Sequence, residues 1–254
     1  MTHQNQILLI TLISISIASS IFMYKKNSNS SQDINSTIIV GTNAEYPPFS
    51  SREDSTIVGF DIDIIKEVVY RLGKQIVIKD MPFEALIPQI QLGSIHIIAA
   101  GMTPSPERAQ QVFFTLPHLA EDPLLILSTK NNPIATTDEL RNKRVVVNEG
   151  FTADYYISSL KIPHIIRLAS IGEGLLALQS DRADAFVTAQ SAIQPFFALH
   201  GESNLVKHII PGTQEEYALV ISKKYPELYM GITKIMNDME KDGTINQIKK
   251  KWHL

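Results

Sequence analysis

Short apolar runs, typical of buried strands, alternate along most of this sequence with longer segments whose apolar residues recur at helical spacing. Between residues 37 and 102 the order is strand, helix, strand, helix, strand. It begins with the strand-like TIIVGT (37–42) and the helix-like GFDIDIIKEVVYRL (59–72). This order is typical of a mostly parallel sheet with helices on both faces. We therefore expect an α/β fold.

The same alternation begins again in the second half of the chain, which predicts another α/β unit of similar length. Its expected strands include PLLILSTK (123–130) and ADAFVTA (183–189). No linker rich in proline, glycine or serine separates the two units. Two strand-like passages connect them instead, and a pair of such connections would act as a hinge between two lobes. We expect one lobe from residues 37–122 together with 217–254, and the other from residues 123–216.

The first 36 residues differ from the rest of the chain. The stretch ILLITLISISIASSIFMY (7–24) carries no charge and, at roughly 18 residues, lies at the lower edge of the length of a membrane span. Lys25, Lys26 and a polar run follow it. We expect an export signal or an uncleaved anchor with a tether over residues 1–36, which places the body in the periplasm. A buried core helix is the alternative.

Composition excludes several kinds of chemistry. The chain has no cysteine, which excludes disulfides, thiol catalysis and cysteine-ligated metals, and its 7 histidines show no HxxxH spacing that would indicate zinc. The formal net charge of −3 gives no indication of binding to nucleic acid or to an anionic membrane surface. We therefore expect no metal, no cofactor and no nucleic-acid partner.

Polar, charged and aromatic residues directly follow the expected strands. Ligands of open α/β sheets bind beyond the carboxyl ends of the strands, so these residues are candidates for a binding site. They include one fixed cation, two aromatic rings and several hydroxyl and amide groups. We expect a ligand site formed by Asn43, Glu45, Tyr46, Phe83, Gly101, Met102, Thr103, Arg108, Thr152 and Gln190.

The arginine among these candidates suits a carboxylate ligand. A guanidinium holds a carboxylate through two parallel N–H bonds, and the Thr103 hydroxyl and backbone N–H groups at Thr152 could add donors to those of Arg108. Tyr46 and Phe83 could stack on a planar cation or cover an aliphatic side chain. The combination fits a small zwitterion such as an amino acid. The alternatives are a solvated arginine, ordinary packing of the two rings, and a helix cap at the threonine.

Six motifs in a fixed order point to a known family. They are VGTNAEYPPFSS, GFDIDIIKEV, FEALIPQIQLGSIHIIAAGMTPSPER, LRNKRVVVNEGFTADYY, RADAFVT and DGTINQIKKKW. Together they resemble the extracytoplasmic solute-binding proteins of ABC transporters, family 3, which bind polar amino acids, and they are most similar to arginine-binding members. The resemblance implies a periplasmic-binding-protein-like fold of two lobes joined by two hinge strands. It also implies a monomer that closes on a free amino acid and delivers it to an inner-membrane permease.

The resemblance implies a role for the polar candidates. Arg108 is similar to the arginine that clamps the α-carboxylate of the ligand. Thr103 and the backbone around Gly101 match positions that add hydrogen bonds to the carboxylate and the amino group. Thr152, at the start of a helix, matches the donor that comes from the opposite lobe.

The remaining candidates would contact the side chain of the ligand. Tyr46 and Phe83 match the pair of rings that encloses this side chain, and Asn43 and Glu45 lie where members recognise its far end. Because the Glu45 carboxylate would repel an acidic ligand and stay unpaired with glutamine, we expect arginine first, then lysine or ornithine, then glutamine.

The sequence departs from the family where the α-ammonium is held. Members usually have an aspartate shortly after the strand that matches DAFVT, and here Ala189 stands at that position. Some other group must accept the N–H bonds of the ammonium. Phe151 and Ala153 also replace smaller or polar residues at the start of the second-lobe helix, which predicts a more apolar pocket floor. The candidate acceptors are Thr188, Gln190, the Gly101 carbonyl and Glu216.

Two functions of other classes remain as alternatives. The fold also resembles a periplasmic cyclohexadienyl dehydratase, in which an arginine clamp serves an enzyme and Glu45 could act as an acid. Two aromatic rings around a cation do not suit a dianionic substrate, so we expect no enzyme. A sensing ectodomain of a larger protein is the other alternative, and the short segment after the last motif disfavours it.

Overall fold

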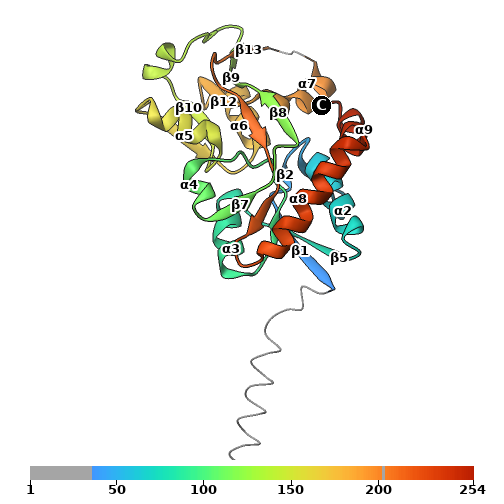
Figure 1. Ribbon diagram of the computed structural model, residues 1–254. Coiled ribbons are helices and arrows are strands. Elements are labelled where there is room, and N and C mark those ends of the chain that lie inside the picture. The colour runs from blue at the N-terminus through green and yellow to red at the C-terminus, as the bar shows by residue number, and fades with distance from the viewer. Residues whose placement is uncertain (1–35, 202–203) are drawn as a thin grey trace, which may run out of the picture. The chain divides into compact units, whose positions relative to one another are not determined.

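The computed structural model describes residues 36–201 and 204–254 (Figure 1). The export signal or anchor expected over residues 1–36 lies outside the described residues, except for residue 36. Among the described residues, no helix is long and apolar enough to cross a membrane. The part of the chain from Ile38 to Leu254 forms a single unit in which every site described below lies.

The first lobe is built on a five-stranded sheet, and we name the lobe after it. The first strand, TIIVGT, forms because its β-branched residues suit a pleated, buried surface: Ile38 and Val40 are fully buried. It pairs in parallel with β6, the strand that follows helix α3 (Leu86–Leu92). In spatial order the strands are β5 (Gln75–Asp80), β1 (Thr37–Thr42), β6 (Ile97–Ile98), β15 (Val220–Ser222) and β7 (Val112–Phe114).

The helices of this lobe follow the apolar spacing of the sequence. Helix α2 (Phe60–Arg71) buries Ile62, Ile65 and Val69, which lie three or four residues apart, and it packs against β5. Figure 1 shows α8 (Pro226–Lys241) and α9 (Thr244–Trp252) next to α2. Helix α3 (Leu86–Leu92) follows a 3-10 turn, η1 (Phe83–Ala85), and ends at Gly93, whose φ of 88° suits glycine.

The second lobe is built on another five-stranded sheet. Its central strand β10 pairs in parallel with β11 and β12, whereas β9 is antiparallel to both of its neighbours. Helices α5 (Thr152–Ser159), α6 (Ile171–Gln179) and α7 (Gln190–His200) pack against this sheet, and a 3-10 turn, η2 (Asp138–Asn142), precedes β10. In spatial order the strands are β11 (Ile165–Leu168), β10 (Val145–Asn148), β12 (Ala185–Ala189), β9 (Leu124–Thr129) and β13 (Leu205–Ile209).

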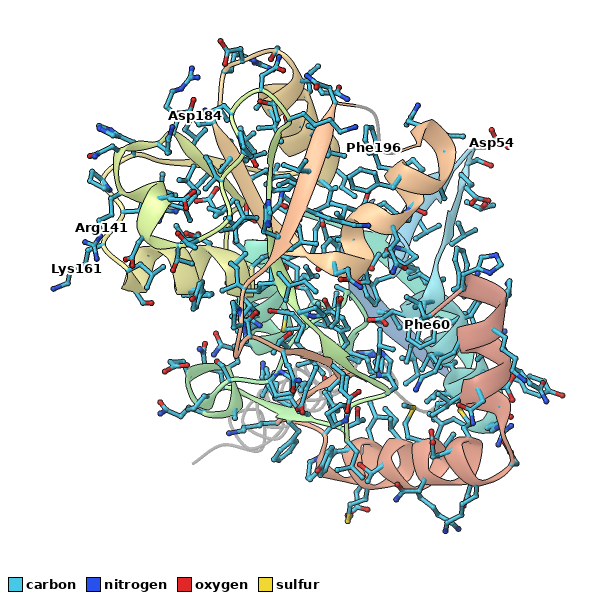
Figure 2. The ribbon with its side chains drawn as sticks, turned by 90° about the horizontal axis from the view of Figure 1, so that it is seen from above. Asp54, Phe60, Arg141, Lys161, Asp184 and Phe196 are labelled. Carbon is cyan, nitrogen blue, oxygen red and sulfur yellow. The ribbon has the colours of Figure 1, made fainter. Side chains whose placement is uncertain are left out.

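Two short strands connect the lobes. β8 (Leu119–Asp122) leads from the first sheet to the second, and β14 (Glu215–Tyr217) leads back. They pair antiparallel, with Glu215 opposite Asp122. The expected two-lobe α/β fold with two hinge strands is therefore confirmed. In Figure 2, Phe60 belongs to the first lobe, whereas Arg141 and Lys161 lie at the outer edge of the second.

Three details differ from the sequence-based expectation. The sheets are mixed rather than mostly parallel, because each takes in strands that enter beside a hinge passage and run antiparallel to their neighbours. The strand-like passage that returns to the first lobe, EYALVIS (216–222), is divided between two strands, β14 and β15, because Ala218 and Leu219 carry the chain from the hinge into the first sheet. A small antiparallel sheet follows β1, formed by β2 (Glu45–Tyr46), β3 (Ser50–Glu53) and β4 (Thr56–Val58).

Candidate functional site

A cavity of about 460 Å³ is lined by residues of both lobes. The first lobe contributes the 3-10 turn after β5 and the loop between β6 and α4 (Pro106–Ala109). The second lobe contributes the end of the loop after β10 and the first turn of α5. The lining residues are Phe83, Glu84, Ile87, Pro88, Met102, Thr103, Pro104, Ser105, Glu107, Arg108, Gln111, Gly150, Thr152 and Tyr155.

Arg108 is a buried cation in the wall of this cavity. Ser105 caps α4 by accepting the backbone N–H of Arg108 at 3.2 Å, and Pro106 starts the helix. The Arg108 side chain is only 7% exposed, so it is not a solvated residue. Its guanidinium donates to the carbonyl oxygens of Thr103 at 2.7 Å and Gly150 at 2.9 Å. Burial lowers the pKa of this guanidinium.

No carboxylate of the described residues lies within ion-pair distance of the Arg108 guanidinium. Two of its five N–H donors are engaged by the carbonyl oxygens, which leaves donors for another acceptor. A buried cation without an anion is costly, and a ligand carboxylate in the cavity would offset that cost.

Glu215 is a buried acid that the sequence analysis missed. It lies on hinge strand β14, is 4% exposed, and accepts the Thr103 hydroxyl at 2.6 Å through Oε2. Its other oxygen, Oε1, has no hydrogen-bond partner among the described residues. Burial raises the pKa of Glu215 from 4.5 to about 7, which the Thr103 bond and the nearby Thr152 side chain partly oppose.

Three aromatic rings meet at the boundary of the lobes. Phe151 stacks on Phe83, with ring centroids 4.0 Å apart, and lies tilted against Tyr46 at 4.7 Å. All three side chains are buried. The two rings expected to enclose a ligand side chain therefore contact a ring of the protein itself.

A chain of hydrogen bonds crosses the hinge beside these rings. The Tyr46 and Tyr217 hydroxyls lie 3.4 Å apart, and the Tyr217 hydroxyl donates to Asp122 at 2.8 Å. Asp122 also accepts the backbone N–H of Ser191, at the start of α7, at 3.0 Å, and the hydroxyl of the same serine. The chain therefore joins the first lobe, both hinge strands and the second lobe.

A family of known proteins shares this arrangement of sequence and fold. The sequence pattern of the bacterial extracellular solute-binding proteins, family 3, matches residues 38–254. This chain belongs to that family. The membership agrees with the resemblance found in the six motifs.

Two similar proteins carry names that state a ligand. The arginine-binding extracellular protein ArtP of Bacillus subtilis is 27% identical over 249 residues, which cover 96% of each chain. The histidine-binding periplasmic protein of Escherichia coli K12 is 28% identical over 226 residues, which cover 85% of this solute-binding protein and 86% of that one.

Solved structures agree with the fold. An ancestral arginine-binding protein bound to arginine superposes with a TM-score of 0.80 at 31% identity, covering 85% of this chain and 97% of that one. The ancestral amino-acid-binding protein AncCDT-1, a precursor of cyclohexadienyl dehydratase, superposes with a TM-score of 0.76 at 30% identity, covering 86% and 96%.

The structure of this solute-binding protein brings most of the expected residues together. Phe83, Met102, Thr103, Arg108 and Thr152 line the large cavity. Tyr46 lines a second, much smaller cavity that Thr152 also borders.

Gly101 packs closely against the Tyr46 ring. The glycine has a φ of 58°, and a Cβ there would lie 2.8 Å from Cε1 of Tyr46. Its backbone N–H donates to the buried Asp61 carboxylate at 2.7 Å, and Asp61 also bonds to Nε2 of His118 at 2.8 Å. The buried pair therefore holds the loop that carries Gly101.

Four expected site residues border neither cavity: Gly101, Asn43, Glu45 and Gln190. Asn43 is buried, and its amide nitrogen donates weakly to the Met81 carbonyl at 3.4 Å. Glu45 is exposed on β2 and borders neither cavity, because the short β2–β3 hairpin turns its side chain to solvent while Tyr46 points inward. Gln190 begins α7, partly exposed, and also borders neither cavity.

The candidate acceptor on the hinge, Glu216, also borders neither cavity. Glu216 is exposed, whereas Glu215 is buried. Successive side chains of a strand point to opposite faces, so Glu215 lies on the same face as the buried Tyr217. This period of two was the signal in the sequence that could have identified Glu215.

Proposed function

We propose that this protein captures a free basic amino acid, with arginine as the first candidate, and presents it to an ABC permease in the periplasm. One observation carries the proposal: a buried guanidinium with no ion-pair partner among the described residues lines the large cavity, and a buried carboxylate with a free oxygen lines the small cavity beside it. Opposite uncompensated charges of this kind are complementary to a zwitterion.

Arg108 would hold the α-carboxylate from the first lobe, with Thr152 as a donor from the second. The Thr103 hydroxyl, which was expected to add a donor here, is committed to Glu215 instead. A ligand bound to one lobe gains contacts with the other only on closure, so closure follows from its higher affinity for the closed state. We propose that residues 37–122 with 217–254 move as one body and 123–216 as the other. The β8–β14 pair would be the hinge.

The preference for a basic side chain rests on charge and on the names of the relatives. Glu84 and Glu107 border the large cavity, and both are exposed at its mouth. We assign them the role expected of Glu45, because that carboxylate is directed to solvent in this conformation. The arginine-binding and histidine-binding names of the similar proteins support a basic ligand.

A thermal-shift screen of the folded protein against the twenty amino acids and ornithine tests the proposal. A ligand that binds only the folded state raises the melting temperature. We expect the largest shift with arginine, followed by lysine and ornithine. No shift with any basic amino acid and a clear shift with glutamate would refute the assignment.

An enzyme of the same fold is the second candidate. Glu215, with its pKa raised to about 7, is a possible general acid beside a guanidinium, and AncCDT-1 is a precursor of a dehydratase. Incubation with cyclohexadienyl acids, followed by product absorbance, distinguishes the two functions. We expect no turnover, and turnover lost in Glu215→Gln would favour the enzyme.

A further inference from the structure

A second cavity lies beside the large one and is about the size of one small polar group. Its volume is about 10 Å³, close to the space that a single water needs. The hinge, the second sheet and the first turn of α5 all contribute to its wall. The lining residues are Tyr46, Leu124, Asn148, Phe151, Thr152, Ala153, Thr188, Ala189 and Glu215.

Two acceptor atoms in this wall have no hydrogen-bond partner among the described residues. One is Oε1 of Glu215, and the other is Oδ1 of Asn148. Both side chains are more than nine-tenths buried, so solvent does not compensate them. The amide nitrogen of Asn148 donates to the Leu168 carbonyl at 3.4 Å, so the Oδ1 atom of Asn148 is the one left without a partner. Buried acceptors of this kind each destabilise a fold unless a donor reaches them.

The other groups of the wall do not supply that donor. Ala153 and Ala189 carry only methyl groups. The Thr152 side chain lies near the Glu215 carboxylate but completes no hydrogen bond to Oε1. The Tyr46 hydroxyl is engaged with Tyr217. The missing donor therefore comes from outside these residues, as a water or as a group of a ligand. A ligand group in this place must be small, rich in N–H or O–H groups, and compatible with a carboxylate.

We propose that Glu215 and Asn148 accept the α-ammonium of the bound amino acid. An ammonium has three N–H donors and a positive charge, which suits one carboxylate oxygen and one amide oxygen. Thr103 donates to the Glu215 carboxylate and lies on the same short loop as Arg108, so the α-carboxylate and α-ammonium would be held side by side. This inference rests on the proposed function, since it names how the same ligand is recognised.

Titration calorimetry with paired ligands tests the assignment. The first ligand is arginine, and the second is 5-guanidinopentanoate, which is arginine without its α-amino group. Agmatine, which lacks the carboxylate instead, reports on the other end. The variants are Glu215→Gln, Asn148→Ala and, as a matched control, Glu216→Gln on the exposed face of the same strand.

In the wild-type protein we expect arginine to bind at least about 100-fold tighter than its deaminated analogue. Glu215→Gln should reduce arginine affinity about 100-fold and leave the affinity for 5-guanidinopentanoate nearly unchanged. Asn148→Ala should reduce the preference for arginine over 5-guanidinopentanoate about tenfold. This second variant keeps the test decisive if Glu215→Gln folds poorly. Glu216→Gln should change the affinity for neither ligand.

An equal loss for both ligands in Glu215→Gln, or an unchanged preference for arginine in both variants, would overturn the assignment. Failure of the proposed function has a different signature, because the wild-type protein would then bind none of the basic amino acids. If another amino acid binds in the screen, that amino acid and its deaminated analogue replace the pair.

Discussion

The Arg108 guanidinium donates a hydrogen bond of 2.9 Å to the Gly150 carbonyl, from the first lobe to the second. The residue expected to bind the ligand therefore also holds the lobes together. Gly150 has a φ of 75° and lies next to Phe151, so the bond fixes the turn that brings the Phe151 ring against Phe83. If Arg108 binds the ligand as proposed, the same side chain serves ligand binding and the contact between the lobes.

Replacement of this side chain tests both roles. We expect Arg108→Ala to lower the affinity for every amino acid more than about 100-fold, because charge-assisted hydrogen bonds to the α-carboxylate are common to all of these ligands. Arg141→Ala is the matched control, since Arg141 lies exposed at the outer edge of the second lobe (Figure 2). Calorimetry with arginine, lysine and glutamine measures the effect. Retained binding of any of them would contradict the role of Arg108.

The raised pKa of Glu215 predicts a pH-dependent stability of the ligand-free protein. Burial favours the protonated acid in the folded state, so its stabilising effect is present below pH 4.5 and is lost as the pH rises through about 7. Asp122 reinforces the shift, whereas Thr103, Thr152 and Arg108 oppose it. Relative to Glu215→Gln, the wild-type protein should lose about 3 kcal/mol of unfolding free energy between pH 4.5 and pH 8.

Urea unfolding of both proteins at the two pH values checks this difference. A constant gap between wild type and Glu215→Gln would show that the carboxyl does not titrate in this window. Glu216→Gln, on the exposed face, should follow the wild-type pH profile.

Removal of the Phe151 ring should lower the stability of the ligand-free protein and raise its affinity for arginine. The ring contacts both Tyr46 and Phe83, which are expected to enclose a ligand side chain. Phe151→Ala should destabilise the ligand-free protein by about 3 kcal/mol, because it leaves a cavity. It should strengthen arginine binding about tenfold, since the ligand no longer displaces a ring.

Thermal unfolding with and without arginine, together with calorimetry, measures the two effects. Phe196→Ala on α7 is the control, because Phe196 borders neither cavity and its ring contacts are with Phe197 and His200. It should lower stability without a change in affinity. Weaker arginine binding in Phe151→Ala would show instead that the ring is part of the binding surface.

A comparison of alanine substitutions at two glycines isolates the contact between Gly101 and Tyr46. Gly212 has a similar positive φ, 76° against 58°, but a Cβ there meets nothing within 4 Å. Gly212→Ala should therefore cost only backbone strain, about 1 kcal/mol, and leave affinity unchanged. Gly101→Ala should cost more and weaken arginine binding, because the added methyl group displaces the Tyr46 ring. Equal effects of the two substitutions on affinity would contradict this role.

Local patterns in the sequence predicted the larger part of the fold. Periodicities of two and 3.6 residues depend only on which face of a strand or helix is buried, so α2, α3, β9 and β12 could be located from apolar spacing. The turn before Arg108 is likewise local, since Ser105 caps the helix and Pro106 starts it. The same holds for the end of α3 at Gly93.

The site was only partly predictable. The loops after the strands were correctly expected to supply Arg108, Thr103 and Thr152 to one cavity. Glu45 was expected to face the ligand and is exposed, because the β2–β3 hairpin that turns it outward was not apparent from apolar spacing. Glu216 was named in place of Glu215, because the burial of one face of β14 depends on its pairing with β8.

The sequence by itself determined the order of strands and helices, the family and the position of the fixed cation, because each depends on neighbouring residues. The tertiary structure alone decided which acid is buried between the lobes and that Phe151 lies against Phe83 and Tyr46. Those contacts join residues more than sixty positions apart, and they exist only where two lobes meet and exclude water.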